Sequence, residues 1–155
     1  MTLHWFLMAL QGESGRVRYV VWVDAWQMQC CGEPFSVGGE VTWALSDQPN
    51  RPWLATVVGA PLADSVTHAE GHHGPWPLGQ VPLVLTGRVV SIRSAFCRYA
   101  SAPSDDRMLL PVQGSAVLHE VSRADGWENA SGDLRFNGYL VRLDVNAEEP
   151  GRQAD

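Results

Sequence analysis

Lysine is absent from this 155-residue chain, and all 11 of its basic residues are arginines. With 17 acidic residues, the formal net charge is −6 at pH 7. Binding to nucleic-acid phosphates or to an anionic membrane surface needs a continuous basic face, and the sequence contains no basic run. Arg88, Arg93 and Arg98 are the best candidates for a small patch, but a strand would place Arg93 on the opposite face from the other two. We therefore expect neither non-specific nucleic-acid binding nor membrane binding.

The common catalytic motifs are missing as well. The chain has no G-x-G-x-x-G, Walker, G-x-S-x-G, H-E-x-x-H or C-x₂-C sequence, which removes the usual indications of dinucleotide, phosphate, hydrolase and zinc-knuckle sites. A nucleophile and a base can be chosen on paper from the three cysteines and five histidines. Any chain with these residues allows such a choice, so it carries little weight.

Cysteine is scarce, and its number is odd. Cys30 and Cys31 are adjacent, and a bridge between neighbouring residues is strained, so we expect them not to be joined. A bridge from Cys97 to either partner would require an exported protein. Reduced thiols in the cytoplasm are the simpler interpretation, and we expect a cytoplasmic protein.

The longest apolar segment, MTLHWFLMAL, is too short to span a bilayer and has no basic residue before it. We expect residues 1–16 to be a translated leader or a disordered extension. A GTG start codon at Val17, with QGE upstream encoded by a ribosome-binding sequence, would account for it. The expected organisation is one domain over residues 17–146 and a disordered tail over 147–155.

Alternation of apolar and polar residues dominates the rest of the chain and predicts strands. Tyr139, Val141, Leu143 and Val145 are expected to point inward. The expected strands lie at 17–26, 40–45, 51–59, 81–99, 107–112, 115–121 and 134–145. Residues 60–80 lose the alternation and predict a long loop, with at most one helical turn near 63–69. The fold class expected is all-β: a small single-domain barrel, OB-like or SH3-like, or a sandwich, with one long irregular loop.

Cys30 and Cys31, together with His72 and His73 of the loop, have the ligand types of a Zn²⁺ site, provided that a turn brings both sulfur atoms to one ion. The alternative is that the thiols pack as small buried hydrophobes and the histidines lie in a solvated loop. Both interpretations are open at this point.

Tryptophan is abundant, with seven residues. Trp22 and Trp26 are expected on one side of the first strand, and barrels of this size bind ligands by stacking them on exposed aromatics with help from arginine. Trp22, Trp26 and Arg93 are therefore candidate ligand-binding residues. Packing of the indoles in the core is the alternative.

Five segments, VWVDAWQMQCCGEPFSVGGEVTW, EGHHG, GRVVSIRSAFCRYA, VQGSAVLHEVSRADGWE and RFNGYLVRLDV, resemble a family of small uncharacterised actinobacterial proteins known mainly from Streptomyces. CCGEPF and EGHHG are the motifs that we associate with this domain of unknown function. The resemblance spans about residues 20–145. It implies a source and a cytoplasmic setting, but no activity, substrate or cofactor.

We expect a non-enzymatic binding or interaction module that could carry zinc, with a protein or a small molecule as its partner. The alternative is a metal- or thiol-dependent enzyme that uses Cys30 and Cys31 together with the histidines of the 60–80 loop. An enzyme requires a pocket in which the thiols and histidines converge, whereas a module requires an accessible aromatic surface.

Overall fold

The structure is a computed structural model that describes residues 15–71 and 81–146. The expectations for 1–14, for the tail 147–155 and for His72 and His73 lie outside the described residues. The elements are β1 Arg16–Asp24, α2 Ala25–Cys31, β2 Phe35–Ser36, β3 Glu40–Ser46, α3 Arg51–Val58, α4 Ala60–Ser65, β4 His68–Glu70, β5 Leu83–Cys97, β6 Tyr99–Ala102, β7 Asp105–Pro111, β8 Val117–Val121, β9 Arg123–Ala124 and β10 Arg135–Asn146.

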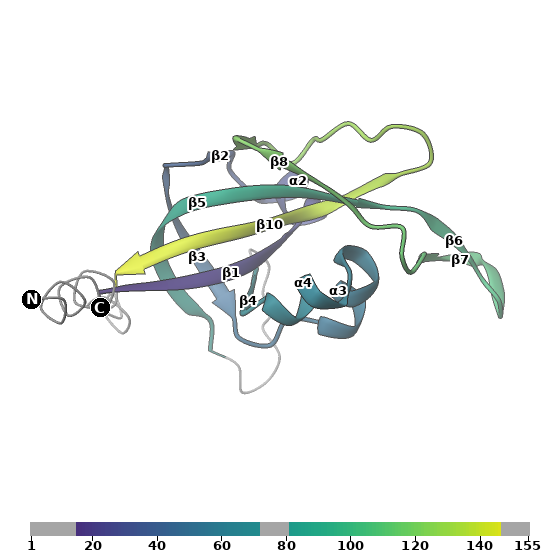
Figure 1. The fold of residues 1–155 in the computed structure, drawn as a ribbon, viewed down its shortest axis with the longest axis horizontal. Helices are drawn as coiled ribbons and strands as arrows, with labels where there is room; N and C mark the ends of the chain where they lie inside the picture. Colours follow the sequence, from purple (N-terminus) through teal and green to yellow (C-terminus); the bar gives the residue numbers. More distant parts are fainter. Residues whose placement is uncertain (1–14, 72–80, 147–155) are drawn as a thin grey trace, which may run out of the picture.

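Five strands close into a barrel in the order β10-β1-β4-β3-β5, with β5 pairing back onto β10. Strands β1 and β4 run parallel, whereas the other pairings in the barrel are antiparallel. Strand β5 pairs with β3 from Leu83 to Arg88 and with β10 from Arg88 to Cys97, so it bends around the barrel near Gly87 (Figure 1). The prediction of a small all-β barrel is confirmed.

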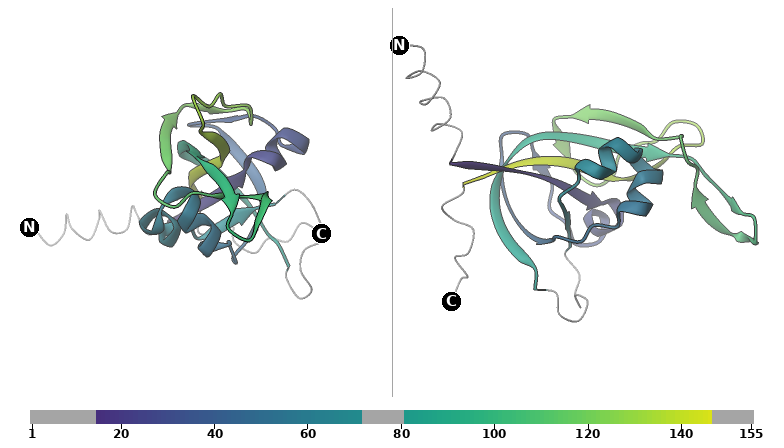
Figure 2. Two further views of the ribbon diagram at one scale, coloured as in Figure 1. Left: turned by 90° about the vertical axis from the view of Figure 1, so that its right-hand side faces the viewer. Right: turned by 60° about the horizontal axis from the view of Figure 1, so that its bottom comes forward.

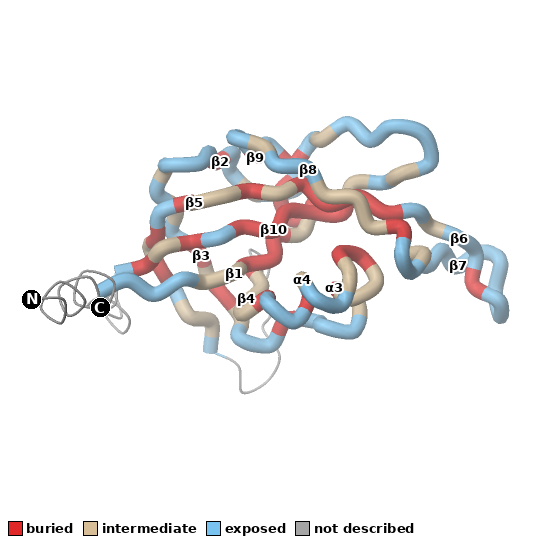
Figure 3. The backbone as a smooth tube through the Cα atoms, in the orientation of Figure 1, coloured by how far each residue is buried: buried red, intermediate tan, exposed pale blue. Residues whose placement is uncertain are grey.

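The barrel interior is filled as the alternation predicted. Its buried side chains come from one face of each strand and include Val21, Val23, Trp43, Leu45, Tyr139, Val141, Leu143 and Val145. The most buried stretches of β1 and β10 run along the middle of the molecule (Figure 3). Period-two burial on β1, β3 and β10 is thus enough to place this core.

Two bulges change the alternation. On β5, Val90 is the extra residue opposite the Arg142–Leu143 step, and on β10 Asn137 is extra opposite the Ala95–Phe96 step. An extra residue reverses the side that later residues face. Val89 and Ile92 therefore share the barrel core, although simple alternation predicted them on opposite faces of this strand.

The segment 51–59 was wrongly predicted as a strand, because it forms helix α3. Asn50 caps the helix by accepting a hydrogen bond from the backbone N–H of Trp53 at 3.3 Å, and Pro52 lies in the first turn. The segment 60–80, expected to be a loop, contributes α4 and β4 in its described part. Both helices lie on the outer face of the barrel, beside β1 in Figure 1, and pack against residues of β1, β5 and β10.

A second apolar cluster joins the helices to the barrel. It includes Trp22, Ala95, Cys97 and Leu140 from the strands and Leu54, Val57, Val58, Ala63 and Val66 from the α3–α4 region. The molecule therefore has two layers of packing: the barrel interior, and the space between the barrel and the helices.

The β6–β7 hairpin extends beyond the barrel (Figure 2). All of β7 except Pro111 is exposed, including Met108, Leu109 and Leu110. None of the helices in the described part of the chain is both long and apolar enough to cross a membrane.

Candidate functional site

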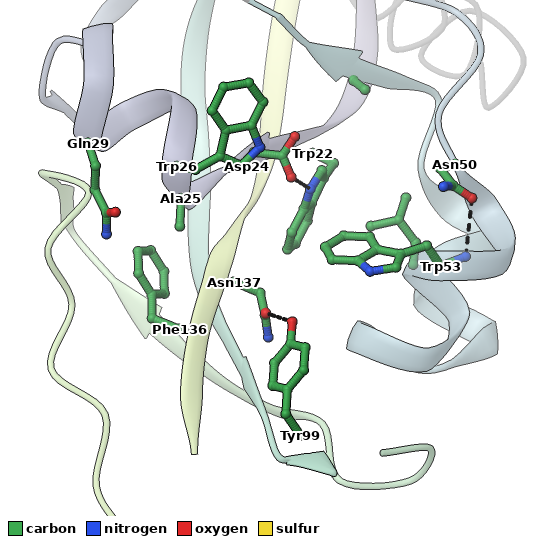
Figure 4. A pocket seen from close by; sticks show the side chains of 12 residues that line it. Trp22, Asp24, Ala25, Trp26, Gln29, Asn50, Trp53, Tyr99, Phe136 and Asn137 are labelled. Carbon is green, nitrogen blue, oxygen red and sulfur yellow. Dashed lines mark hydrogen bonds between the residues drawn. The ribbon is translucent and has the colours of Figure 1, made fainter. Parts of the chain in front are cut away.

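A cavity of about 530 Å³ opens where the ends of β1 and β10 meet α2, α3 and β6. Its volume lies in the range of small-molecule sites. Five of the 12 residues in its wall are aromatic, and the side chains that point toward it can be followed in Figure 4. The lining residues are Trp22, Asp24, Ala25, Trp26, Gln29, Asn50, Trp53, Leu54, Ala69, Tyr99, Phe136 and Asn137.

Asp24 is the acidic group of this wall, at the junction of β1 and α2. Its Oδ1 atom accepts a hydrogen bond from the indole N–H of Trp22 at 2.8 Å, and Oδ2 accepts one from Gln27 at 3.5 Å. Burial raises the pKa of Asp24, while hydrogen bonds from Trp22, Gln27 and Trp26 act in the opposite direction. The indoles thus orient the carboxyl group, but the hydrogen bonds to it make up only in part for the water that it has lost on burial.

Trp22 and Trp53 form an aromatic corner. Their ring centroids are 5.8 Å apart and the planes meet at 69°. Trp22 is 3% exposed and comes from β1, whereas Trp53 comes from the first turn of α3. Two packed elements therefore fix these rings, so the corner exists before any ligand arrives.

A hydrogen-bonded chain forms another side of the cavity. The Tyr99 hydroxyl donates to Oδ1 of Asn137, and Nδ2 of Asn137 donates to the Cys97 sulfur at 3.2 Å. Burial, together with the neighbouring Cys97, raises the pKa of Tyr99 to about 12. Burial also raises the pKa of the Cys97 thiol. Asn137 reaches the cavity because it is the bulged residue of β10.

The structure brings together two of the three predicted ligand-binding residues. Trp22 and Trp26 both line the cavity, although Trp26 lies on α2 and not on the first strand as expected. Arg93 does not line it, because it lies on β5 between its cross-strand partners Leu140 and Glu120.

Sequence reasoning missed Trp53, Tyr99 and Asn137. The pattern Asn-x-Pro-Trp, which is a helix-start signal, could have placed Trp53. No local signal marks the bulge that turns Asn137 toward the cavity.

Cys30 and Cys31 end helix α2, and the structure joins them in a disulfide. This differs from the prediction of unbridged thiols. Both residues are exposed, so they are not small core hydrophobes either. In the bonded form neither sulfur is a thiolate, which is the state that coordinates zinc.

The predicted metal site stays a prediction, because the structure describes only two of its four ligands, Cys30 and Cys31. Over 15–71 and 81–146, no group of three or more His, Cys, Asp or Glu side chains is placed to hold a metal ion. Its remaining predicted ligands, His72 and His73, lie outside these ranges. Cys31 instead lines a second cavity of about 700 Å³, together with Glu33, Glu40 and Trp43.

Glu70 is a buried carboxyl group close to the cavity. It lies opposite Leu45 in the β3–β4 pairing and is 3% exposed. The preceding residue, Ala69, lines the cavity, so alternation directs Glu70 toward the barrel interior. Burial, and to a lesser extent the charge of Asp24, raises the pKa of Glu70 to about 8.

Comparison with known proteins gives a family but no activity. No curated protein and no solved structure matches the chain. A model of a family of unknown function, DUF6578, matches residues 17–145, which include nearly all of the barrel, the helices α2, α3 and α4, and every residue that lines the cavity. The chain therefore belongs to the DUF6578 family of unknown function.

Proposed function

We propose that this protein is a non-enzymatic binding module that takes a small molecule into the aromatic cavity between α2, α3 and β6. The observation that supports this most strongly is the composition of the wall: three tryptophans, a tyrosine and a phenylalanine surround about 530 Å³. Aromatic walls with a few placed polar groups are typical of ligand sites. Asp24, Asn50 and Asn137 are the polar groups that would orient the ligand.

The thiol-enzyme alternative has weaker support. Catalysis by a cysteine needs a reactive thiolate with a base in reach. Cys97 is fully buried, and burial raises the pKa of its thiol, which disfavours the thiolate. Cys30 and Cys31 are bonded to each other, and neither lines the aromatic cavity. A binding role, by contrast, needs only the aromatic and polar side chains that already line the cavity.

Substitution of Trp26 tests the proposal with little risk to the fold. Trp26 is 57% exposed and lines the cavity, whereas Trp127 is 64% exposed and does not. We expect Trp26→Ala to weaken binding of monocyclic aromatic fragments about tenfold, because stacking on one ring contributes roughly 1–3 kcal/mol. Trp127→Ala should bind like the wild type. Ligand-observed NMR with a mixed set of cationic, neutral and anionic fragments measures this.

The comparison between the two variants tests whether the fragments bind in this cavity. Equal affinities in Trp26→Ala and Trp127→Ala, or the absence of any bound fragment in the set, would contradict a ligand site in this cavity. Guanidinium unfolding of both variants checks that they remain folded.

A further inference from the structure

We propose that the ligand of the aromatic cavity is an organic ammonium cation, with its charged nitrogen against the Asp24 carboxylate and its hydrocarbon groups against Trp22, Trp26 and Trp53. This inference rests on the proposed binding function and specifies its ligand class. It follows from the charge of the cavity wall and from the arrangement of the rings.

The described wall of the cavity carries one acidic group and no basic one. Asp24 is the acidic group, and the other eleven of the 12 lining residues are aromatic, aliphatic or amide side chains. Arg135 lies near the site, with its guanidinium carbon 5.7 Å from the centre of the Tyr99 ring, but it does not line the cavity. The field inside the cavity is therefore negative, which favours a cationic guest and opposes an anionic one.

The hydrogen bonds to Asp24 orient the indoles suitably for a cation. Trp22 directs its N–H edge, the positive part of the ring system, at the carboxylate, and Trp26 also donates to Asp24. The electron-rich faces of the rings then border the space beside the carboxylate (Figure 4). A cation within about 6 Å of such a face is attracted by it, most strongly for tryptophan.

The hydrogen bonds to the Asp24 carboxylate also do not compensate fully for its burial. Hydrogen bonds from Trp22, Trp26 and Gln27 lower the pKa of Asp24, but burial raises it by more, so the net shift is upward. A bound cation would supply the missing opposite charge beside a carboxyl group that burial has partly removed from water, where the attraction is less screened than at the surface. A neutral planar ligand would stack on the rings but would leave the charge of Asp24 uncompensated.

Three soluble ligands that share one ring separate the possibilities: benzylammonium, benzyl alcohol and benzoate. We expect benzylammonium to bind at least tenfold more tightly than benzyl alcohol, and benzoate to bind more weakly than the alcohol. Benzyltrimethylammonium, which cannot donate a hydrogen bond, should also bind better than the alcohol, because the ring faces attract its charge. Calorimetry at low ionic strength, near neutral pH, measures the four affinities.

Substitution of Asp24 assigns the preference to the carboxylate. Asp24→Asn keeps an oxygen that can accept the Trp22 hydrogen bond, and we expect it to reduce the benzylammonium-to-alcohol ratio to about one. Asp133→Asn removes one negative charge from an exposed position outside the cavity, and it should keep the tenfold preference.

The outcomes separate this inference from the proposed function. Benzyl alcohol binding as tightly as benzylammonium to the wild type would overturn the inference and leave a neutral-ligand module. Failure of all four ligands would overturn both. A tenfold preference that survives in Asp24→Asn would also contradict the assignment, because the charge would then be recognised elsewhere. The wild-type comparison remains decisive if Asp24→Asn does not fold.

Discussion

Replacing Gly138 with alanine is expected to destabilise the protein by about 3 kcal/mol, because the new methyl group has no room. A Cβ atom at this position would lie 2.3 Å from the carbonyl oxygen of Val23 and 2.7 Å from Cζ2 of Trp22. The first of these is backbone in the β1–β10 pairing, so it cannot rotate away. Gly138 follows the bulged residue of β10 and lets the Trp22 indole lie directly against the strand.

Chemical unfolding followed by tryptophan fluorescence measures this effect. Gly15→Ala is a matched control, because a Cβ there meets nothing within 4 Å, and it should change the free energy of unfolding by less than about 0.5 kcal/mol. Since Trp22 lines the cavity, Gly138→Ala should also weaken fragment binding under conditions in which the variant is still folded. A stability within about 1 kcal/mol of the wild type would show that β1 and β10 can separate at this point.

The barrel could be predicted from the sequence because its interior is filled from one face of each strand. Alternation on β1, β3 and β10 is unbroken over the residues that fill the interior, so period-two reasoning placed Val21, Trp43 and Val141 correctly. It failed on β5, where the extra residue Val90 reverses the sides within one strand. Bulges are set by pairing between distant segments, and a single sequence does not show that pairing.

Helix α3 was missed for a different reason, because its signals were present in the sequence. Asn50, Pro52 and Gly59 are the cap, first-turn and end residues that mark a helix, and Leu54, Val57 and Val58 have helical spacing. The segment was instead predicted as a strand. Correct assignment of this helix would have placed Trp53 in its first turn, but its contact with Trp22 of β1 depends on the tertiary fold.

The candidate cavity was predictable only in part. Trp22 and Trp26 were both selected and both line the cavity, although alternation was wrongly extended from the end of β1 into α2. The wall opposite these tryptophans comes from β6 and β10, which lie about 75 to 115 residues after the end of β1 in the sequence. The geometry of this wall depends on the bulge at Asn137. Sites assembled from such distant segments need the tertiary fold before their members can be grouped.

Glu70 should make the protein less stable as the pH rises from about 5 to 8. Burial raises the pKa of Glu70 to about 8 in the folded state, whereas the ordinary value, which applies to the unfolded chain, is 4.5. Between these values the folded protein holds a proton that the unfolded chain has released. Stability therefore falls with rising pH across this window and levels off above about pH 8. The full effect, reached above pH 8, is roughly 5 kcal/mol, since each pKa unit corresponds to about 1.4 kcal/mol.

Glu70→Gln isolates this contribution, because glutamine keeps the shape of the protonated acid and does not ionise. Its free energy of unfolding should match that of the wild type near pH 5 and exceed it by an amount that grows toward pH 8, up to roughly 4 kcal/mol. Groups that titrate identically in both proteins cancel in this difference. The negative charge of Asp24 contributes to this stability difference with the same sign, because it opposes ionisation of Glu70.

The matched control is Glu33→Gln, which makes the same change at an exposed site and should stay within about 0.5 kcal/mol of the wild type throughout. A Glu70→Gln difference that is constant with pH would mean that Glu70 ionises in the folded barrel as readily as in the unfolded chain. The interior end of the barrel beside Leu45 would then have to be open to water, in conflict with a side chain that is 3% exposed. The pH titration therefore tests whether the barrel is closed at the end that lies next to the cavity.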